Sequence, residues 1–508
     1  MDLEARLESG TRPRDHVRIA VVGCCHGELE LIYNLLGDIA ARENRDVDLL
    51  ICCGDFQATR NEADLACMAC PVKHRSMVSF YKYYSGERRA PVPTIFIHGN
   101  HEASNHLTEL YHGGWVAPNI YYMGYAGVVR FGGLRIAGYS GIYNRSSYNL
   151  GHFETCPYSD SQMRTVYHHR EYEKFQLAQL KGPIDIFLSH DWPRNIHRYG
   201  DERSLLRVKP HFMEDIQRGD LGSPAHEELL STLKPKYWFA GHMHVKFPAI
   251  VRHSNTPGDL TRFVALDKPI PNRDFLQVLD IPVEPTTAPF ALEYDDEWLA
   301  ILRNTWNLFP RSSQRISMPN ARAPRAYVPP ALVLPQLADE ERKKTMADTT
   351  AATTTEVKGE DPKSSITSAY LAVAAEAESQ KVRYNFTPTS AEMELARKLA
   401  LMVNGGNLLI DPSRFIQTAP VYVDRGRFNP NAAQPSTEEP LNPQSAHLCN
   451  MLGVEPGDHF QVYVPSAVEL LGQKRMLDAV ERGTVAQEES SGTQAAVSNP
   501  DEIDLDGI

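Results

Sequence analysis

IAVVGCCHGELE, residues 19–30, joins a short apolar run to a turn that carries two thiols and an imidazole. The run at 19–22 has the length and composition of a β-strand that is buried on both faces. It stops at Gly23 and places Cys24, Cys25 and His26 just beyond the end of the strand. This stretch therefore predicts reactive side chains at the end of a central strand.

Similar apolar runs, each followed by polar residues, recur over the first half of the chain. Because they lack a regular alternation of apolar and polar residues, they predict strands covered on both faces, in a layered α/β fold. The runs are VRIAVV, DLLICC, TIFI, IDIFLS and KYWFA, at 17–22, 48–53, 94–97, 184–189 and 236–240.

Other elements follow from local signals. Gly132 and Gly133 predict the turn of a hairpin, and the stretch 263–282 predicts two further strands. Apolar residues at helical spacing predict helices over 171–181 and 293–309. Thr389 and Glu392 have the spacing of a capping box at the start of a later helix.

Five short motifs each follow one of the apolar runs. In layered α/β folds, ligands bind just beyond the carboxyl ends of the strands, so loops far apart in the sequence can converge there. Each motif alone is common, but all five at strand ends predict one functional site. The motifs are GCCHG (23–27), GD (54–55), GNHE (99–102), SHDWP (189–193) and GHMH (241–244).

The residue types in these motifs suit a metal site. A mixture of imidazole, carboxylate and amide oxygen favours Zn, Mn or Fe at divalent charge. A carboxylate such as Asp55 can bridge two ions about 3.5–4 Å apart, which together clamp a displacement at phosphorus. His101 is placed to protonate the departing oxygen. The candidate ligands in the motifs are His26, Asp55, Asn100, His190, His242 and His244.

The bulk composition limits the classes of function. The 508 residues carry a formal net charge of −12, which argues against a general electrostatic grip on nucleic acid but leaves room for a local basic groove. No stretch approaches 18 continuous apolar residues, so we expect no membrane span. Eight cysteines in a chain of this length predict no disulfide scaffold and suggest a reducing compartment. Cys67 and Cys70 have CxxC spacing without a second pair, so packing is expected there rather than zinc.

The order of the motifs resembles the pattern of the calcineurin-like metallophosphoesterases. Within that superfamily, longer strings resemble the RNA lariat debranching enzymes: AVVGCCHGELE, LLICCGDFQATRNEADL, GNHEASNHL and KYWFAGHMHVKF. The resemblance is dense over about 17–310 and reaches about 454 in patches. It implies a metallophosphoesterase β-sandwich flanked by helices, with a smaller C-terminal domain. It also implies hydrolysis of the 2′–5′ phosphodiester at the branch point of excised intron lariats, and therefore a nuclear location.

The resemblance also implies roles for individual residues. One metal site would use Cys24, His26, Asp55 and His244, and the second would use Asp55, Asn100, His190 and His242. His101 would protonate the leaving 2′-oxygen. The cofactors would be one or two divalent ions, Fe²⁺, Zn²⁺ or Mn²⁺.

Cys24 stands where the wider superfamily has aspartate. A thiolate is softer than a carboxylate and favours Zn or Fe over Mn and Mg. Cys24 either bonds the metal or lies near it without a bond and leaves that site weaker. Cys25 is expected to face the core. His98, where a glycine is expected, either binds phosphate or points away.

The resemblance places a lariat-recognition insertion at about 139–175. Aromatic faces for unstacked bases and cations for phosphates are what a branch-point reader needs. The candidate RNA-binding residues are Tyr143, Arg145, Tyr148, His152 and Phe153. The alternative is that the aromatic residues pack a small core within the insertion.

The expected organisation has several parts. Residues 1–16 form a flexible N-terminus, 17–282 the catalytic domain, and 283–465 a C-terminal domain with a disordered insertion at about 310–366. Residues 466–508 form an acidic tail that is expected to be disordered, and either disordered segment is a place for protein partners. Branched RNA is the expected partner of the catalytic domain.

Two other classes of protein fit parts of the sequence. A general metallophosphatase or exonuclease would share the metal motifs, although GDFQATR lacks the Asp-Arg pair typical of protein phosphatases. A metal-free scaffold would share the fold, but such chains lose candidate ligands that this chain retains.

Overall fold

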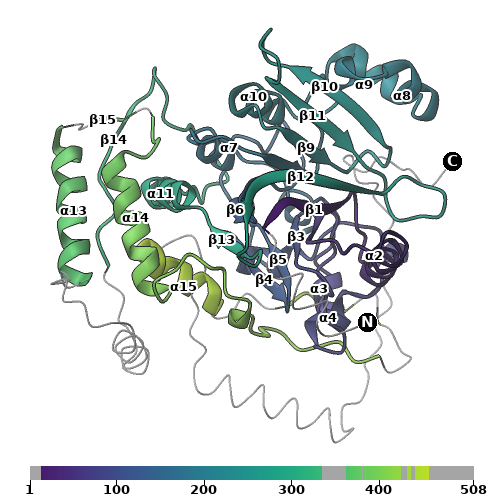
Figure 1. Ribbon diagram of the computed structural model, residues 1–508, viewed down its shortest axis with the longest axis horizontal. Helices are drawn as coiled ribbons and strands as arrows, with labels where there is room; N and C mark the ends of the chain where they lie inside the picture. The colour runs from purple at the N-terminus through teal and green to yellow at the C-terminus, as the bar shows by residue number, and fades with distance from the viewer. Residues whose placement is uncertain are drawn as a thin grey trace, which may run out of the picture.

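Two β-sheets pack face to face in the computed structural model, which describes residues 13–333, 362–379, 382–383, 385–424, 429, 432–435 and 441–456 (Figure 1). One sheet has the strand order β12-β1-β2-β3-β5-β4 and the other β10-β11-β9-β8-β7-β6-β13. The first consists of β1 (Arg14–Val22), β2 (Leu49–Cys53), β3 (Thr94–Ile97), β4 (Gly114–Ala117), β5 (Ile120–Tyr122) and β12 (Leu276–Thr286). The second consists of β6 (Ala126–Phe131), β7 (Leu134–Tyr139), β8 (Ile186–Ser189), β9 (Tyr237–Ala240), β10 (Phe247–Arg252), β11 (Leu260–Ala265) and β13 (Leu292–Tyr294).

The central strands of each sheet run parallel. β1, β2, β3 and β5 are parallel in the first sheet, and β7, β8, β9 and β11 are parallel in the second. The register pairs Ile19 with Leu49 and Ile51 with Ile95. Because parallel strands end at the same edge of a sheet, the loops that carry the motifs open together.

β1 shows why these runs lack alternation. Ile19 and Val21 pack between the two sheets, whereas Ala20 and Val22 pack beneath the helices outside the first sheet. Both faces of the strand are therefore apolar, as predicted from the sequence.

Helices cover the outer face of each sheet. α2 (Leu29–Glu43), α4 (Phe80–Tyr84) and α5 (Ser104–Glu109) pack on the first, and α7 (Glu171–Leu177), α10 (Pro224–Leu233) and α11 (Asp296–Thr305) pack on the second. The result is the expected β-sandwich flanked by helices. The short helices α3 (Glu62–Leu65), α6 (Asp160–Met163), α8 (Glu202–Val208) and α9 (Phe212–Arg218) lie in the connections. None of the described helices has the length and hydropathy that crossing a bilayer requires.

A C-terminal group of helices packs against α11. It consists of α13 (Pro362–Ser379), α14 (Ser390–Val403) and α15 (Pro443–Leu452), with the short pair β14 (Arg325–Ala326) and β15 (Val382–Arg383) at one end (Figure 1). α14 begins at the predicted capping box, in which Thr389 and Glu392 each satisfy the other's backbone N–H.

After α14 the chain returns to the catalytic half. The Arg60 guanidinium is fully buried between Asp64 and Glu109, and its Nη1 donates to Thr418 Oγ1 at 2.9 Å. The backbone N–H of Tyr422 donates to the Arg60 carbonyl at 3.0 Å. Residues 418–422 thus cover the loop that follows β2.

Several predicted boundaries are wrong. Helix α11 starts only at Asp296, because residues 292–294 pair with β6 and Asp295 caps the helix. α7 ends at Leu177 rather than at 181. Residues 310–333 and 362–366, assigned to a disordered insertion, are ordered because Met318 and Tyr327 are buried and α13 begins at Pro362.

Two other boundaries concern the ends of the chain. β1 begins at Arg14, within the N-terminal segment expected to be flexible. Residues 1–12, 334–361 and the predicted tail at 466–508 lie outside the described residues.

Candidate metal centre

Four of the predicted ligands converge from three loops. Single donor atoms of Cys24, His26, Asp55 and His244 all lie within 4.8 Å of one another, beyond the ends of β1, β2 and β9. His26 Nε2 lies 3.3 Å from His244 Nε2 and 3.8 Å from Asp55 Oδ2. This is the group assigned from the sequence to the first metal site.

The second group meets on the other side of Asp55. His190 Nε2 lies 3.3 Å from Asp55 Oδ1 and 3.2 Å from Asn100 Oδ1. The ring of His242 lies 4.9 Å from the ring of His190, between centroids. Asp55 therefore directs one carboxylate oxygen toward each group, as a bridging ligand would.

The hydrogen bond at the far side of His190 fixes its tautomer. His190 Nδ1 lies 2.8 Å from the Cys53 carbonyl oxygen, which can only accept, so this nitrogen carries the proton. In the neutral ring, Nε2 then presents a lone pair toward the oxygens of Asp55 and Asn100. Three electron-pair donors facing one another fit a cation between them.

The backbone at the site adopts an unusual conformation. Four candidate ligands have positive φ: His26 at 48°, Asp55 at 43°, His242 at 65° and His244 at 45°. Residues other than glycine adopt this left-handed region at a cost, and such residues cluster at functional sites. The loops are thus held in place by the surrounding fold rather than by local preference.

Two glycines permit the close approach of the ligands. A Cβ atom at Gly54 would lie 2.1 Å from His190 Nδ1, and one at Gly99 would lie 2.2 Å from Asp55 Oδ1. Any side chain at either position would displace a candidate ligand.

Burial and charge set the protonation states. Burial lowers the pKa of His26 to about 4 and also lowers the pKa of His190. Burial opposes ionisation of Asp55, but His190, His101 and His26 together hold the pKa of its carboxyl below the usual value. These shifts favour neutral His26 and His190 and a charged Asp55, which are the forms that bind metal.

Cys24 is equally enclosed. Burial, followed by the charge of Asp55, raises the pKa of its thiol, and the His242 backbone N–H donates to Sγ at 3.1 Å. Its position among nitrogen and oxygen donors fits a thiolate ligand to a metal, because a metal ion displaces the thiol proton.

Glu102 is a site residue to which the sequence analysis gave no role. Its buried carboxylate accepts hydrogen bonds from the backbone N–H groups of Phe56 at 2.6 Å, Gln57 at 2.8 Å and Gly99 at 3.2 Å. These bonds tie the loop after β2 to the loop after β3. Its place as the fourth letter of GNHE was the signal in the sequence.

His101 lies beside both loops. Its backbone N–H donates to Asp55 Oδ1 at 2.9 Å, and its half-buried ring lies 5.9 Å from the ring of His26. The side chain is therefore close to the metal centre but is separate from the two ligand groups.

The predicted RNA-binding residues differ in where they lie and in how far they are exposed. Tyr143 approaches the centre, because its backbone N–H donates to Asp191 beside His190 at 3.3 Å, and its ring lies 5.4 Å from that of Tyr148. Arg145 is exposed and Phe153 is half-buried. The insertion also has the small core that was the alternative, which includes Ile142, Tyr158, Met163 and Val166.

His152 lies in the interior instead. Its Nε2 is 2.8 Å from Glu173 Oε1 and 3.0 Å from the Tyr111 hydroxyl, and its ring stacks on Phe309 at 5.7 Å. Enclosed in this way, His152 shapes the insertion from within rather than presenting its ring to RNA.

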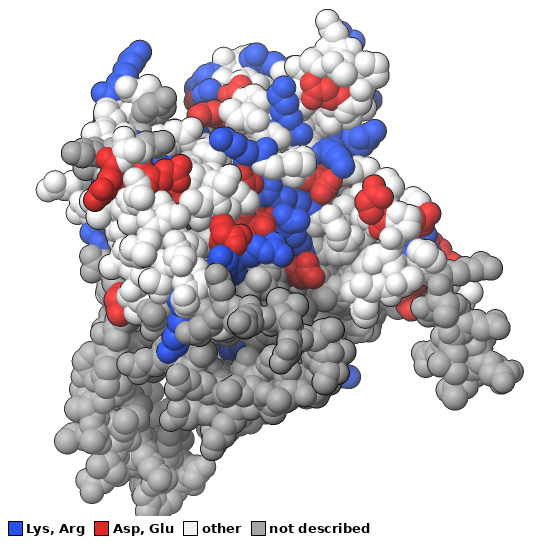
Figure 2. Space-filling view, turned by 60° about the vertical axis from the view of Figure 1, so that its left-hand side comes forward, with Lys and Arg blue, Asp and Glu red and all other residues white. Residues whose placement is uncertain are grey.

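A basic segment lies alongside the insertion. Gly151 N–H donates to Ser312 O at 2.7 Å, and Ile316 N–H donates to Asn149 O at 2.8 Å. The stretch 311–325 contains four arginines and no acidic residue, a signal that the linker assignment overlooked. In the described part of the chain, the exposed side chains of Arg315, Arg322 and Arg325 form no ion pair. Figure 2 shows basic side chains gathered near the centre of one face, with acidic side chains beside them.

Other residues singled out from the sequence serve packing. Cys25 faces the core beneath α2, as predicted. His98 is buried with Nδ1 2.6 Å from the Tyr122 hydroxyl. Among the described residues, Cys67 and Cys70 belong to no cluster of three or more metal-binding groups.

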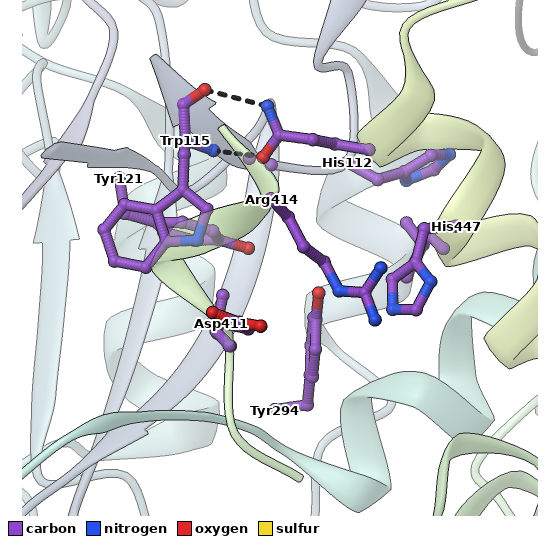
Figure 3. Close-up of a pocket in the computed structure, with 12 residues that line it drawn as sticks. His112, Trp115, Tyr121, Tyr294, Asp411, Arg414 and His447 are labelled. Atoms are coloured by element: carbon purple, nitrogen blue, oxygen red, sulfur yellow. Dashed lines mark hydrogen bonds between the residues drawn. The ribbon is translucent and has the colours of Figure 1, made fainter. Parts of the chain in front are cut away.

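A small cavity elsewhere marks the junction with the C-terminal helices (Figure 3). It measures about 20 Å³, which is room for one or two waters, and Trp115, Arg414 and His447 line it. The Gln444 side chain spans the junction, because it bonds both the N–H of Trp115 at 2.7 Å and its carbonyl at 2.9 Å. The cavity contains none of the predicted site residues.

Comparison with known proteins decides the family. Residues 17–246 match the calcineurin-like phosphoesterases, and residues 258–456 match the C-terminal domain of lariat debranching enzyme. The lariat debranching enzyme of Drosophila pseudoobscura pseudoobscura is 40% identical over 514 aligned positions, which cover 94% of this chain and 83% of that protein. This chain belongs to the lariat debranching enzyme family. The resemblance seen in the motifs is thereby confirmed.

Vertebrate members of the lariat debranching enzyme family match a shorter region. Lariat debranching enzyme A of Xenopus laevis is 55% identical over 306 residues, and the Homo sapiens enzyme is 56% identical over 307. Each match covers 60% of this chain and 57% or 56% of the relative. The chain thus spans little more than half the length of these relatives. The metallophosphoesterase family implies divalent metal ions, and the group around Asp55 offers a place for them.

Proposed function

We propose that this chain is a metal-dependent phosphodiesterase that hydrolyses the 2′–5′ phosphodiester bond at the branch point of excised intron lariat RNA. The reaction linearises the intron for turnover. The observation that carries the proposal is the position of Asp55, with one oxygen toward each ligand group, in a chain of the lariat debranching family. The substrate is inferred from membership of the family, and metal-dependent hydrolysis is inferred from the candidate ligands.

Two sets of residues would hold the metal ions. Cys24, His26, Asp55 and His244 form the first set, and Asp55, Asn100, His190 and His242 form the second. When bound, Fe²⁺, Zn²⁺ or Mn²⁺ ions at these sets neutralise charge on the phosphoryl oxygens and acidify the attacking water.

The protein's own side chains position the metal ligands and protonate the leaving oxygen. His101 donates a proton to the departing 2′-oxygen of the branch nucleotide. The Cys53 carbonyl holds His190 in one tautomer, and Glu102 keeps the two metal-binding loops together. The backbone N–H of His101 donates a hydrogen bond to the Asp55 carboxylate, which fixes the position of His101 relative to Asp55.

Cys24 sets the preference among metals. We expect Cys24→Asp to retain more Mn²⁺ and less Zn²⁺ or Fe²⁺ than the wild-type protein, because a carboxylate is a harder ligand than a thiolate. Metal content after dialysis against equal concentrations of the three ions measures this. Cys25→Ser changes a neighbouring thiol in the core and serves as the control. Unchanged metal content and preference in Cys24→Asp would mean that the thiol does not contact the metal.

Recognition of the branched RNA is assigned to the insertion and the basic segment beside it. Arg145 and Arg315 are both exposed cations, and residue 315 pairs with Leu150 of the insertion. We expect Arg145→Ala with Arg315→Ala to raise KM for branched RNA about tenfold. The slope of log affinity against log salt should also fall by about one for each phosphate that the variant no longer binds. The exposed Arg203 on α8 provides a matched control. Equal KM values in the double variant and in Arg203→Ala would remove this surface from recognition.

Cleavage of a defined branched RNA tests the function directly. The protein is first stripped of metal with a chelator and then supplied with Mn²⁺, Zn²⁺ or Fe²⁺. It is incubated with a short RNA that has one 2′–5′ linkage beside its 3′–5′ bonds. Selective loss of the branch supports debranching. Cleavage of linear RNA of the same composition would indicate a general nuclease. A folded protein that cleaves neither RNA with any metal would indicate a scaffold.

The substrate also suggests where the protein acts. Excised introns arise in the nucleus, so we propose a nuclear location, which imaging of the tagged chain in cells would test. The segments at 334–361 and 466–508 are the proposed places for protein partners, and truncation of each followed by affinity purification would test them.

A further inference from the structure

Two thiols from separate parts of the catalytic half face each other. Cys67 Sγ lies 3.9 Å from Cys156 Sγ, and both cysteines are free. Cys67 follows α3, close after the loop that carries Asp55, whereas Cys156 belongs to the insertion. Neither residue has a part in the metal centre or in the proposed reaction.

Packing on both sides holds the thiols together. Cys67 belongs to the small core of the insertion with Tyr158, and Cys156 packs against that core. Gln434 bonds the backbone of Tyr158 twice, accepting from its N–H at 2.5 Å and donating to its carbonyl at 3.0 Å. A disulfide needs the sulfurs about 2.0 Å apart, so closing the gap requires a movement of about 2 Å.

The two cysteines differ in exposure and in the direction in which their pKa values are shifted. The hydrogen bond with Cys67 lowers the pKa of Cys156, although burial opposes this shift, and Cys156 is partly exposed. Cys67 is buried. A partly exposed cysteine whose sulfur lies 3.9 Å from that of a second, buried cysteine is the arrangement of a redox-sensitive pair.

We propose that Cys67 and Cys156 form a peroxide-sensitive dithiol whose disulfide ties the insertion to the catalytic core. The Cys156 thiolate attacks hydrogen peroxide, the O–O bond breaks, and the departing hydroxide leaves as water once protonated, which leaves Cys156 as a sulfenic acid. The Cys67 sulfur then attacks that sulfur. The S–S bond forms, the S–O bond breaks, and the hydroxide leaves as water with the proton of Cys67. Two thiols are oxidised and one peroxide is reduced to two waters.

The proposal is tested by mapping thiols in the full chain, without RNA or metal-dependent activity. After peroxide treatment, alkylation and digestion without reductant, we expect one peptide pair linked through Cys67 and Cys156. Two alkylatable thiols per chain should be lost and should return on reduction. Hydrogen exchange of the insertion should slow in the oxidised protein, because the crosslink restrains its opening.

Three single variants make the test specific. Cys67→Ser and Cys156→Ser should each abolish the linked pair, whereas Cys70→Ser, in the same CxxC motif, should retain it. Unchanged thermal unfolding shows that a variant is folded, and trapping of a sulfenic acid at Cys156 in Cys67→Ser would identify the order of reaction. A link from Cys67 to Cys70, over-oxidation of Cys156 without a link, or eight unreacted thiols with no linked pair would overturn the proposal.

Discussion

Replacing His101 with alanine is expected to lower the turnover of branched RNA by about 100- to 10,000-fold while the metal content stays at the wild-type level. His101 lies outside both ligand groups, and its bond to Asp55 comes from the backbone, which the substitution keeps. The loss should therefore fall on protonation of the leaving oxygen. Single-turnover cleavage of a branched RNA and metal analysis of the same sample measure the two quantities.

A second substrate separates proton donation from a structural effect. A phosphodiester with a nitrophenolate leaving group needs no proton, so His101→Ala should slow its cleavage much less than that of RNA. His211→Ala, at an exposed histidine before α9, should leave both substrates unaffected. An equal loss on both substrates would contradict the role of His101 as the proton donor.

Replacing Asp55 with asparagine is expected to empty both metal sites and to reduce cleavage below detection. The amide removes the negative charge between the two ligand groups and leaves one oxygen where the carboxylate directs two. Metal content after dialysis should fall toward zero in the variant. Because the side chain keeps its shape, thermal unfolding of the metal-free protein should change little.

Comparison with a ligand from one group tests whether Asp55 bridges. His244 belongs to the first group alone, so His244→Ala should lose up to one ion per chain where Asp55→Asn loses up to two. If the two variants lose equal amounts of metal from a protein that holds two ions, Asp55 serves one site and the bridging assignment is wrong.

The candidate site was accessible from the sequence because of how the strands are arranged. Each candidate ligand follows a run of apolar residues, and parallel strands end at a common edge, so the position along the chain determines the position in space. His26, Asp55 and His244 could therefore be grouped although 218 residues separate the outer two. The layered sandwich followed from the same runs, since Ile19 and Ala20 face opposite layers.

Features that depend on distant partners could not be predicted in this way. His152 appears in the sequence as a cation among aromatic residues, but Phe309, far along the chain, encloses it. The role of Glu102 depends on three backbone groups in two loops. Residues 293–294 have helical spacing, yet their pairing with β6 takes precedence.

The return of residues 418–422 onto Arg60 has a consequence for how the protein is made. When the ribosome has synthesised all strands of both sheets, it has not yet reached Thr418. The hydroxyl of Thr418 accepts a hydrogen bond from the buried guanidinium of Arg60. Until residues 418–422 have been synthesised, nothing from this part of the chain can cover the loop that follows β2. We expect nascent chains that end before this point to be inactive, so that only polypeptides synthesised almost to the last described helix would begin to process RNA.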